Sequence, residues 1–317
     1  MNETAIAFAT SEHIGLLTPD GRLLSRFHCR FRENDVAFQF AGLSWRSDRA
    51  GLLYCGHQAR RWMHLFSTNL DGSRQQRLFP DPERSALMVH SPACAADGRI
   101  ALVLGAGAEA RRIELLDPSS GASEALHSAG ADQTLGSPTW LGPGNRLAWV
   151  QTVFRGSAPG AARYEGSQLE LRDLRGGPQT TLLAASHHEA LEQIRAAPDG
   201  RRLAVLRRRE LELLGGRTYS EWTQGIANPK HAEYLRKIAR QLHPIPLEQR
   251  SLNLYDLGLR EERSVYRGAI EAFDWSPQGE LLVLTDGATI SLIEPDGPTT
   301  SIYRCENDEV RALAWAN

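Results

Sequence analysis

Three features of the amino-acid sequence predict an all-β fold, a six-bladed β-propeller of four-stranded blades. A short apolar strand, a Pro/Asp/Gly turn and a second apolar strand recur along the 317 residues, six times if the truncated last copy is counted. That last copy stops at the C-terminus, while the first strands of the chain lack such a beginning. Only one stretch has the periodicity of an amphipathic helix. Repeats at intervals of about 40 to 50 residues are typical of propeller blades.

The first strand of each repeat ends at an anchor residue, which is Trp in four of the six copies. Successive anchors are 49, 46, 56, 79 and 40 residues apart. The residues two and five positions before each anchor are apolar in every copy, as a packed core between neighbouring blades requires. The anchors are Trp45, Cys94, Trp140, Ala196, Trp275 and Trp315.

A turn and three further strands follow each of the first five anchors. Asp97-Gly98 is typical of the first turn and precedes the most apolar strand of its repeat. A second turn, such as Asp71-Gly72 or Asp296-Gly297, leads to the strand that closes the blade. Asp and Gly favour such turns because their backbones tolerate left-handed conformations. They lack the closely spaced acidic ligands of a calcium loop.

The two ends of the chain are predicted to share one blade. Residues 310–316 supply its first strand, and the first 28 or so residues supply the other three. A blade built in this way would close the ring and cover strand edges that would otherwise pair with other chains. Residues 1–317 are therefore predicted to form a single propeller domain, with a loop-helix insertion at about 215–250 in the fourth full blade.

The insertion contains the one predicted helix. Asn228 and Pro229 form a favourable helix start, and the helix is expected to run to about Leu242. Its apolar stripe either packs on the propeller rim or serves as a lid or partner-binding surface. Arg217, Tyr219 and Trp222 precede it and are the predicted ligand-facing residues of the insertion.

Composition and charge exclude several classes of protein. With 36 basic and 38 acidic residues, the net charge of −2 argues against nucleic-acid binding. There is no run of about 18 apolar residues to cross a membrane and no signal peptide, so we expect a cytoplasmic monomer. The four cysteines have no CxxC spacing, and no metal or cofactor is predicted.

Two segments resemble the TolB-type β-propeller repeat, in which an aromatic residue precedes Ser-Pro-Asp-Gly and an apolar strand. These segments are 275–279, Trp-Ser-Pro-Gln-Gly, and 197–200, Ala-Pro-Asp-Gly. More distantly, His90-Ser91-Pro92 is similar to a His-x-Pro of oligogalacturonate lyases. The resemblance implies the fold, whereas functions within such propellers range from scaffolds to sugar lyases. The export signal and N-terminal αβ domain of TolB are not seen, which favours a role outside the periplasm.

The predicted site lies at one mouth of the central channel, on the face that carries the insertion. The residues four positions before each anchor should ring this mouth, and four of the six are ionisable. They are Ala41, His90, Gly136, Glu192, Glu271 and Arg311. Such groups can bind a charged ligand or shift one another's pKa values, or they can simply line a water-filled channel.

Two functions are compatible with this site. The first is a non-catalytic scaffold that binds a protein, a peptide or a small polar ligand, because no GxSxG, P-loop or HExxH motif occurs. The alternative is a carbohydrate lyase in which His90 or Glu192 is the base and Arg311 holds a uronate carboxylate. We favour the scaffold and assign no catalytic residue.

Overall fold

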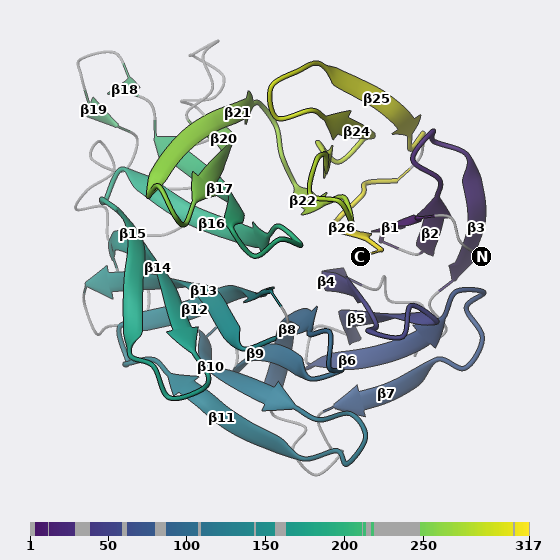
Figure 1. Ribbon diagram of the computed structural model, residues 1–317, viewed down its shortest axis with the longest axis horizontal. Helices are drawn as coiled ribbons and strands as arrows, with labels where there is room; N and C mark the ends of the chain where they lie inside the picture. Colours follow the sequence, from purple (N-terminus) through teal and green to yellow (C-terminus); the bar gives the residue numbers. More distant parts are fainter. Residues whose placement is uncertain are drawn as a thin grey trace.

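The computed structural model confirms the all-β fold, in which six four-stranded antiparallel sheets surround a central axis as the blades of a propeller (Figure 1). The structure describes residues 4–11, 13–28, 39–58, 62–79, 87–106, 109–142, 144–155, 163–210, 212–213, 217–218, 248–306 and 308–316. These residues contain no helix, and hence none that would cross a membrane. The helix predicted from Asn228 to about Leu242 lies outside them.

Each blade is a meander whose first strand lies nearest the axis (Figure 1). Blade one comprises β4 (Gln39–Trp45), β5 (Gly51–Gln58), β6 (Trp62–Asn69) and β7 (Gln76–Phe79). Blade two comprises β8 (Leu87–Cys94), β9 (Ile100–Ala106), β10 (Glu109–Leu116) and β11 (Ser123–Ser128). Blade three comprises β12 (Gln133–Leu141), β13 (Arg146–Arg155), β14 (Arg163–Asp173) and β15 (Gln179–Ala185).

Blade four comprises β16 (Glu189–Ala196), β17 (Arg202–Glu210), β20 (Glu248–Asp256) and β21 (Glu261–Arg267). A two-stranded ribbon, β18 (Glu212–Leu213) and β19 (Arg217–Thr218), follows β17. Blade five comprises β22 (Ala272–Trp275), β23 (Leu282–Thr285), β24 (Thr289–Ile293) and β25 (Thr299–Arg304). Blade six comprises β26 (Ala312–Trp315), β1 (Ile6–Ala9), β2 (His13–Leu17) and β3 (Leu23–His28).

Blade six contains strands from both ends of the chain. The C-terminal strand β26 pairs antiparallel with β1, from Ile6 opposite Trp315 to Ala9 opposite Ala312. Backbone hydrogen bonds continue the ladder beyond both strand ends, from Arg311 N to Ala9 O and from Ala316 N to Ala5 O. Pairing of this kind satisfies backbone groups that a free strand edge would leave open.

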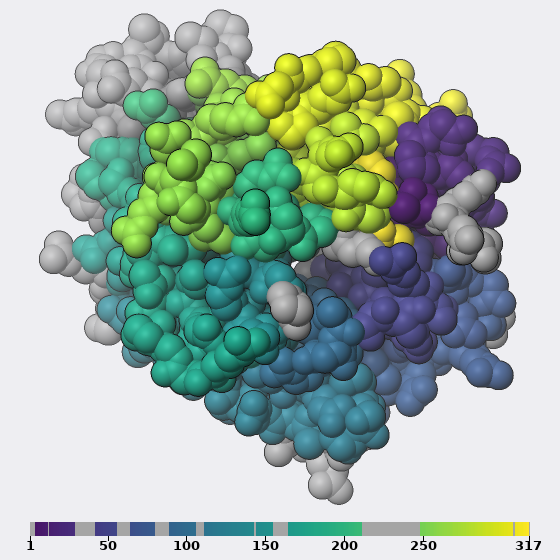
Figure 2. All heavy atoms as spheres, in the orientation of Figure 1, coloured from purple at the N-terminus to yellow at the C-terminus, as the bar shows by residue number. Residues whose placement is uncertain are grey.

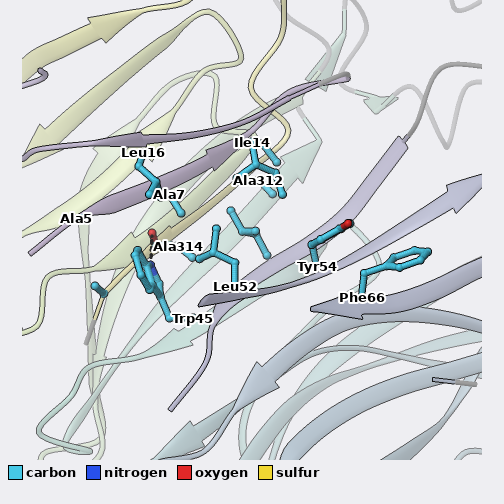
Figure 3. Packing of buried hydrophobic residues seen from close by; sticks show 13 residues of the cluster. Ala5, Ala7, Ile14, Leu16, Trp45, Leu52, Tyr54, Phe66, Ala312 and Ala314 are labelled. Atoms are coloured by element: carbon cyan, nitrogen blue, oxygen red, sulfur yellow. Dashed lines mark hydrogen bonds between the residues drawn. The ribbon is translucent and has the colours of Figure 1, made fainter. Parts of the chain in front are cut away.

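Six clusters of buried apolar side chains form the core, one at each junction between neighbouring blades. Figure 3 shows the junction between blades six and one, where Trp45 packs against the alanines of β1 and β26. The Trp45 indole N–H donates to the carbonyl of Ala314 at 3.1 Å. Trp140 and Trp275 donate in the same way to the preceding blades. In these three anchors, Trp buries a large apolar surface while its indole N–H is satisfied. The indole nitrogen of the fourth, Trp315, is buried without a hydrogen-bond partner in the described part of the chain.

The first turns of three successive blades receive arginine side chains from the blade before. Arg99, Arg146 and Arg202 donate to the carbonyls of Gly144, Gly200 and Gly279, at 2.8, 3.2 and 2.9 Å. The guanidinium groups of Arg99 and Arg202 also lie over the rings of Trp140 and Trp275, about 5 Å from the ring centroids. The long planar guanidinium suits this reach across a junction better than a lysine ammonium does.

Candidate functional site

The predicted ring at the insertion-bearing end of the channel is partly assembled. Arg250 of β20 joins two of its members, because Arg250 Nε lies 3.1 Å from Glu192 Oε2 and Arg250 Nη1 lies 3.3 Å from Glu271 Oε1. Arg250 Nη1 also donates to the carbonyl of Ile270 at 2.9 Å. Glu192 and Glu271 therefore do lie close together, with a cation between them.

A second arginine extends this network. Arg208 Nε donates to Glu192 Oε1 at 2.7 Å, and Arg208 Nη1 lies 3.2 Å from Glu248 Oε1. Burial alone would lower the pKa of Arg208, but Glu248 and Glu192 together outweigh it and raise that pKa. The carboxylates at this end of the channel are thus already engaged by arginines of the protein.

The other two ionisable members of the ring stand apart. His90 is half-buried in β8, and burial lowers the pKa of its imidazole. Arg311 precedes β26 and forms an exposed ion pair with Glu309. Within the described part of the chain, neither residue forms an ion pair or a hydrogen bond with Glu192 or Glu271. The lining positions Gly136 and Ala41 contribute no charge.

The predicted residues of the insertion lie largely outside the described structure. Arg217 begins strand β19, where its backbone pairs with Leu213. Tyr219 and Trp222 lie outside the described residues. Their approach to the channel stays a prediction.

A cavity of about 370 Å³ opens in the channel at its other end, between the turns that join the first and second strands of the blades. We call this end of the channel the turn end. Figure 2, which views the molecule along the axis, shows it hollowed near its centre. The residue directly before each anchor lines the cavity in all six blades. These residues are Ser44, Ala93, Thr139, Arg195, Asp274 and Ala314.

In alternate blades, this residue accepts a hydrogen bond from the backbone N–H of the next anchor. Ser44 Oγ accepts from Cys94 N at 3.4 Å, and Thr139 Oγ1 accepts from Ala196 N at 3.0 Å. In blade five, Asp274 accepts the corresponding hydrogen bond, from Trp315 N to its Oδ2 at 2.8 Å. In blades one and three, a neutral hydroxyl accepts the corresponding hydrogen bond. The backbone contact therefore does not require the negative charge of Asp274.

Asp274 and Arg195 place opposite charges on the wall of the same cavity, from neighbouring blades. Burial raises the pKa of the Asp274 carboxyl, and the Arg195 charge opposes this effect without cancelling it. Arg195 Nη1 donates to the carbonyl of its own neighbour Ile194 at 3.0 Å. Among the described ion pairs, none joins Arg195 to Asp274, so the two charges act on each other without a direct contact and both line the cavity.

Further polar groups line the turn end. Arg46, which pairs with Asp48, and Arg49 extend from the first turn of blade one. The thiol of Cys94 is half-buried there, and burial raises its pKa. In the described ranges, no group of three or more His, Cys, Asp or Glu side chains is placed to hold a metal ion.

The sequence prediction missed this cavity because it followed the positions two, four and five before each anchor. The position directly before the anchor carries the relevant signal, since Ser, Thr, Arg and Asp occur there beside an apolar neighbour on each side. Polar residues at that position in a strand facing a channel would have identified the turn end.

Comparisons with known proteins agree with the fold. No protein-family model and no curated protein matches the sequence. The structure of TolB from Acinetobacter baumannii is similar over 99% of this chain, with 15% identity and a TM-score of 0.64. This chain spans 66% of that structure's length. A putative TolB from Agrobacterium tumefaciens is similar over 99% of both chains, with 11% identity and a TM-score of 0.56.

An oligogalacturonate lyase in complex with manganese is similar over 94% of this chain and 84% of its own, with 12% identity and a TM-score of 0.49. The similarity to the two TolB structures shows a shared TolB-like propeller fold. A shared fold does not indicate a shared activity.

Proposed function

We propose that this chain is a non-catalytic binding scaffold whose ligand is a small zwitterion bound at the turn end of the channel. One observation supports the proposal: two side chains of opposite charge, Asp274 and Arg195, line the same cavity and form no ion pair with each other. The TolB-like fold agrees with a binding role and adds no information on the ligand.

The size and lining of the cavity suit a small molecule. Its volume of about 370 Å³ lies at the lower end of the range of roughly 300 to 1,000 Å³ for small-ligand sites. Apolar surface comes from Trp45, Trp140 and three prolines, and polar side chains, among them Arg195 and Asp274, supply the rest of the wall. Binding sites commonly combine an apolar wall with a few polar groups that fix orientation.

The two charged side chains still have capacity for a ligand. The Asp274 carboxylate uses one acceptor site on each oxygen, for Trp275 N and Trp315 N, and has about two more. Arg195 uses one of its N–H groups for a carbonyl and has others to donate. An ammonium group at Asp274 and a carboxylate at Arg195 would each gain a charge-assisted hydrogen bond.

The test is calorimetric titration with small probes that differ in charge and in the separation of their charges. Glycine, 3-aminopropionate and 4-aminobutyrate carry both charges at increasing separation, whereas acetate and methylammonium carry one each. We expect saturable binding of at least one zwitterion and much weaker binding of the singly charged probes. Asp274→Asn and Arg195→Gln should each weaken that binding at least tenfold, while both variants keep the far-ultraviolet dichroism of the parent.

Glu271→Gln is the matched control, because it removes a carboxylate at the insertion-bearing end of the same channel. Unchanged zwitterion binding in this variant is expected. If no zwitterion binds, or if Glu271→Gln weakens binding as much as Asp274→Asn does, the turn end is not the ligand site. The second result would support the mouth predicted from the sequence, with Glu192 and Glu271 as ligand contacts.

A further inference from the structure

Two histidines meet on the outer strands of blade six, away from the channel. His13 begins β2 and His28 ends β3, and they are direct partners in the antiparallel register. Their Nε2 atoms are 3.1 Å apart, and their ring centroids are 3.9 Å apart. His13 is half-buried and His28 is exposed, so solvent reaches the pair.

We propose that His13 and His28 bind one divalent transition-metal ion through their Nε2 atoms. Zinc lies about 2.0 to 2.1 Å from a histidine nitrogen, and two such bonds that span 3.1 Å meet at roughly 100°. This angle lies between the octahedral and tetrahedral values, so the distance between the two nitrogens allows one ion to contact both. Each ring must turn so that its Nε2 lone pair faces the ion, while the strand register stays unchanged. Imidazole nitrogen is a ligand that zinc, copper and nickel share.

The cross-strand register fixes the positions of the two histidines relative to each other. Directly opposed residues on neighbouring strands have side chains on the same face of the sheet and close together. The position of His28 is supported from blade one as well, because Gln75 Nε2 donates to the His28 carbonyl at 3.0 Å. Both ligands are therefore positioned by backbone pairing rather than by a loop.

Arg26 opposes metal binding in a specific way. Its Nη2 lies 3.2 Å from His13 Nδ1. Because a guanidinium can only donate a hydrogen bond, His13 Nδ1 must accept it. The His13 proton then resides on Nε2 in the metal-free protein and points at His28. Coordination through Nε2 requires this proton to move to Nδ1, and Arg26 must turn away. Since Arg26 is exposed, the movement is available to it.

The protein supplies two ligands in its described part, where no third His, Cys, Asp or Glu joins them. With these two ligands, we expect weaker binding than at a closed structural site with four protein ligands. A bound ion would join β2 to β3 and stabilise blade six by preferential binding to the folded state.

The experiment uses the full chain without an affinity tag, titrated with Zn²⁺, Ni²⁺ and Cu²⁺ in competition with a chromophoric chelator. One ion per chain is expected, together with a rise in melting temperature at saturating Zn²⁺. His13→Ala and His28→Ala should each weaken binding at least tenfold. Arg26→Gln should strengthen it several-fold, because glutamine removes the charge and can accept from Nδ1–H. A purely structural hydrogen bond between the histidines would not produce that gain.

His187→Ala is the matched control, since His187 is an exposed histidine whose ring lies against that of His188 in the connection between blades three and four. It should bind the metal as the parent does. Parent-like binding in both His13→Ala and His28→Ala, loss of binding in His187→Ala, or no ion bound at millimolar concentration would overturn the proposal. With Cu²⁺, electron paramagnetic resonance should show two equivalent nitrogen ligands in the parent and one in either single variant.

Discussion

The Asp274 carboxylate joins blade five to the strand that ends the chain, and its replacement measures that contact. Asp274→Ala leaves the Trp315 N–H, now bonded at 2.8 Å, without its acceptor, and an unsatisfied buried donor costs about 1 to 3 kcal/mol. Asp274→Thr imports the residue that blade three uses at the same position, where Thr139 accepts at 3.0 Å. We therefore expect Asp274→Thr to be more stable than Asp274→Ala by about 1 to 3 kcal/mol.

The pH dependence separates the charge from the hydrogen bond. Burial raises the folded-state pKa of Asp274 above its ordinary value of 3.8, so the folded protein binds this proton more readily than the unfolded chain. The contribution of Asp274 to the free energy of unfolding then falls as the pH rises through the raised pKa. Relative to Asp274→Thr, the parent should gain stability as the pH is lowered from neutral towards 4.

Urea unfolding at neutral pH and near pH 4.5 provides the assay, with the slope of each transition checked for constancy. Ser44→Ala is the comparison, because its contact to Cys94 N is longer, at 3.4 Å, and should cost less than Asp274→Ala. Equal stability of Asp274→Ala and Asp274→Thr would refute the backbone contact. A difference between parent and Asp274→Thr that is the same at both pH values would refute the role of burial.

Three further predictions concern the junctions and the cavity. Trp275→Phe removes the indole donor and leaves a smaller ring beneath Arg202, so it should cost about 1 to 3 kcal/mol. A double-mutant cycle in urea that combines Trp275→Leu, which has no ring, with Arg202→Gln should give a coupling of roughly 0.5 to 1 kcal/mol, and zero coupling would contradict the stacking. Gly200→Ala places a Cβ 2.8 Å from a backbone nitrogen of blade three, at a φ of +65°. It should lower the free energy of unfolding more than Gly121→Ala does, because Gly121 has a similar φ of +71° but open space around it. Equal losses of stability would show that only the backbone conformation matters. Timed alkylation with mass spectrometry should modify Cys94 before the fully buried Cys55. The rate at Cys94 should rise with pH, because burial raises the pKa of its thiol. Equal rates for the two cysteines would show that reagents do not reach Cys94 through the channel.

The repeat pattern predicted the blades well because each repeat combines two independent signals. The anchor Trp marks where a buried strand ends, as Trp275 does in blade five with no exposed surface. The Asp-Gly turn marks the reversal, as Gly98 does with its φ of +92°. Both signals are local in sequence and require no knowledge of distant contacts.

The site could not be predicted as completely, because counting back from the anchor fails inside the first strands. β-bulges interrupt β8 between His90 and Ala93 and β12 between Gly136 and Thr139. Ser91 and Ser137 adopt positive φ values of 49° and 47° within them. A bulge re-aims the side chains that precede it, so residues four positions before the anchor need not share a direction with those directly before it.

The partner of the two glutamates was also beyond the sequence. Arg250 lies on β20, on the far side of the insertion from Glu192, and nothing in the local pattern connects them. Arginine enrichment itself was visible, since 34 of the 36 basic residues are Arg. Its use across blade junctions, as by Arg202 to the Gly279 carbonyl, depends on contacts between residues 77 positions apart.

The two ends of the channel differ in what a ligand must displace. At the insertion-bearing end, Glu192 and Glu271 share Arg250, so an incoming charged group must break a formed ion pair and leave a partly buried partner uncompensated. At the turn end, Asp274 and Arg195 are held by backbone groups that a ligand need not disturb. A ligand with both charges gains contacts there without breaking any. Because of this asymmetry, Asp274→Asn should weaken zwitterion binding and Glu271→Gln should not, although both remove one carboxylate from the same channel.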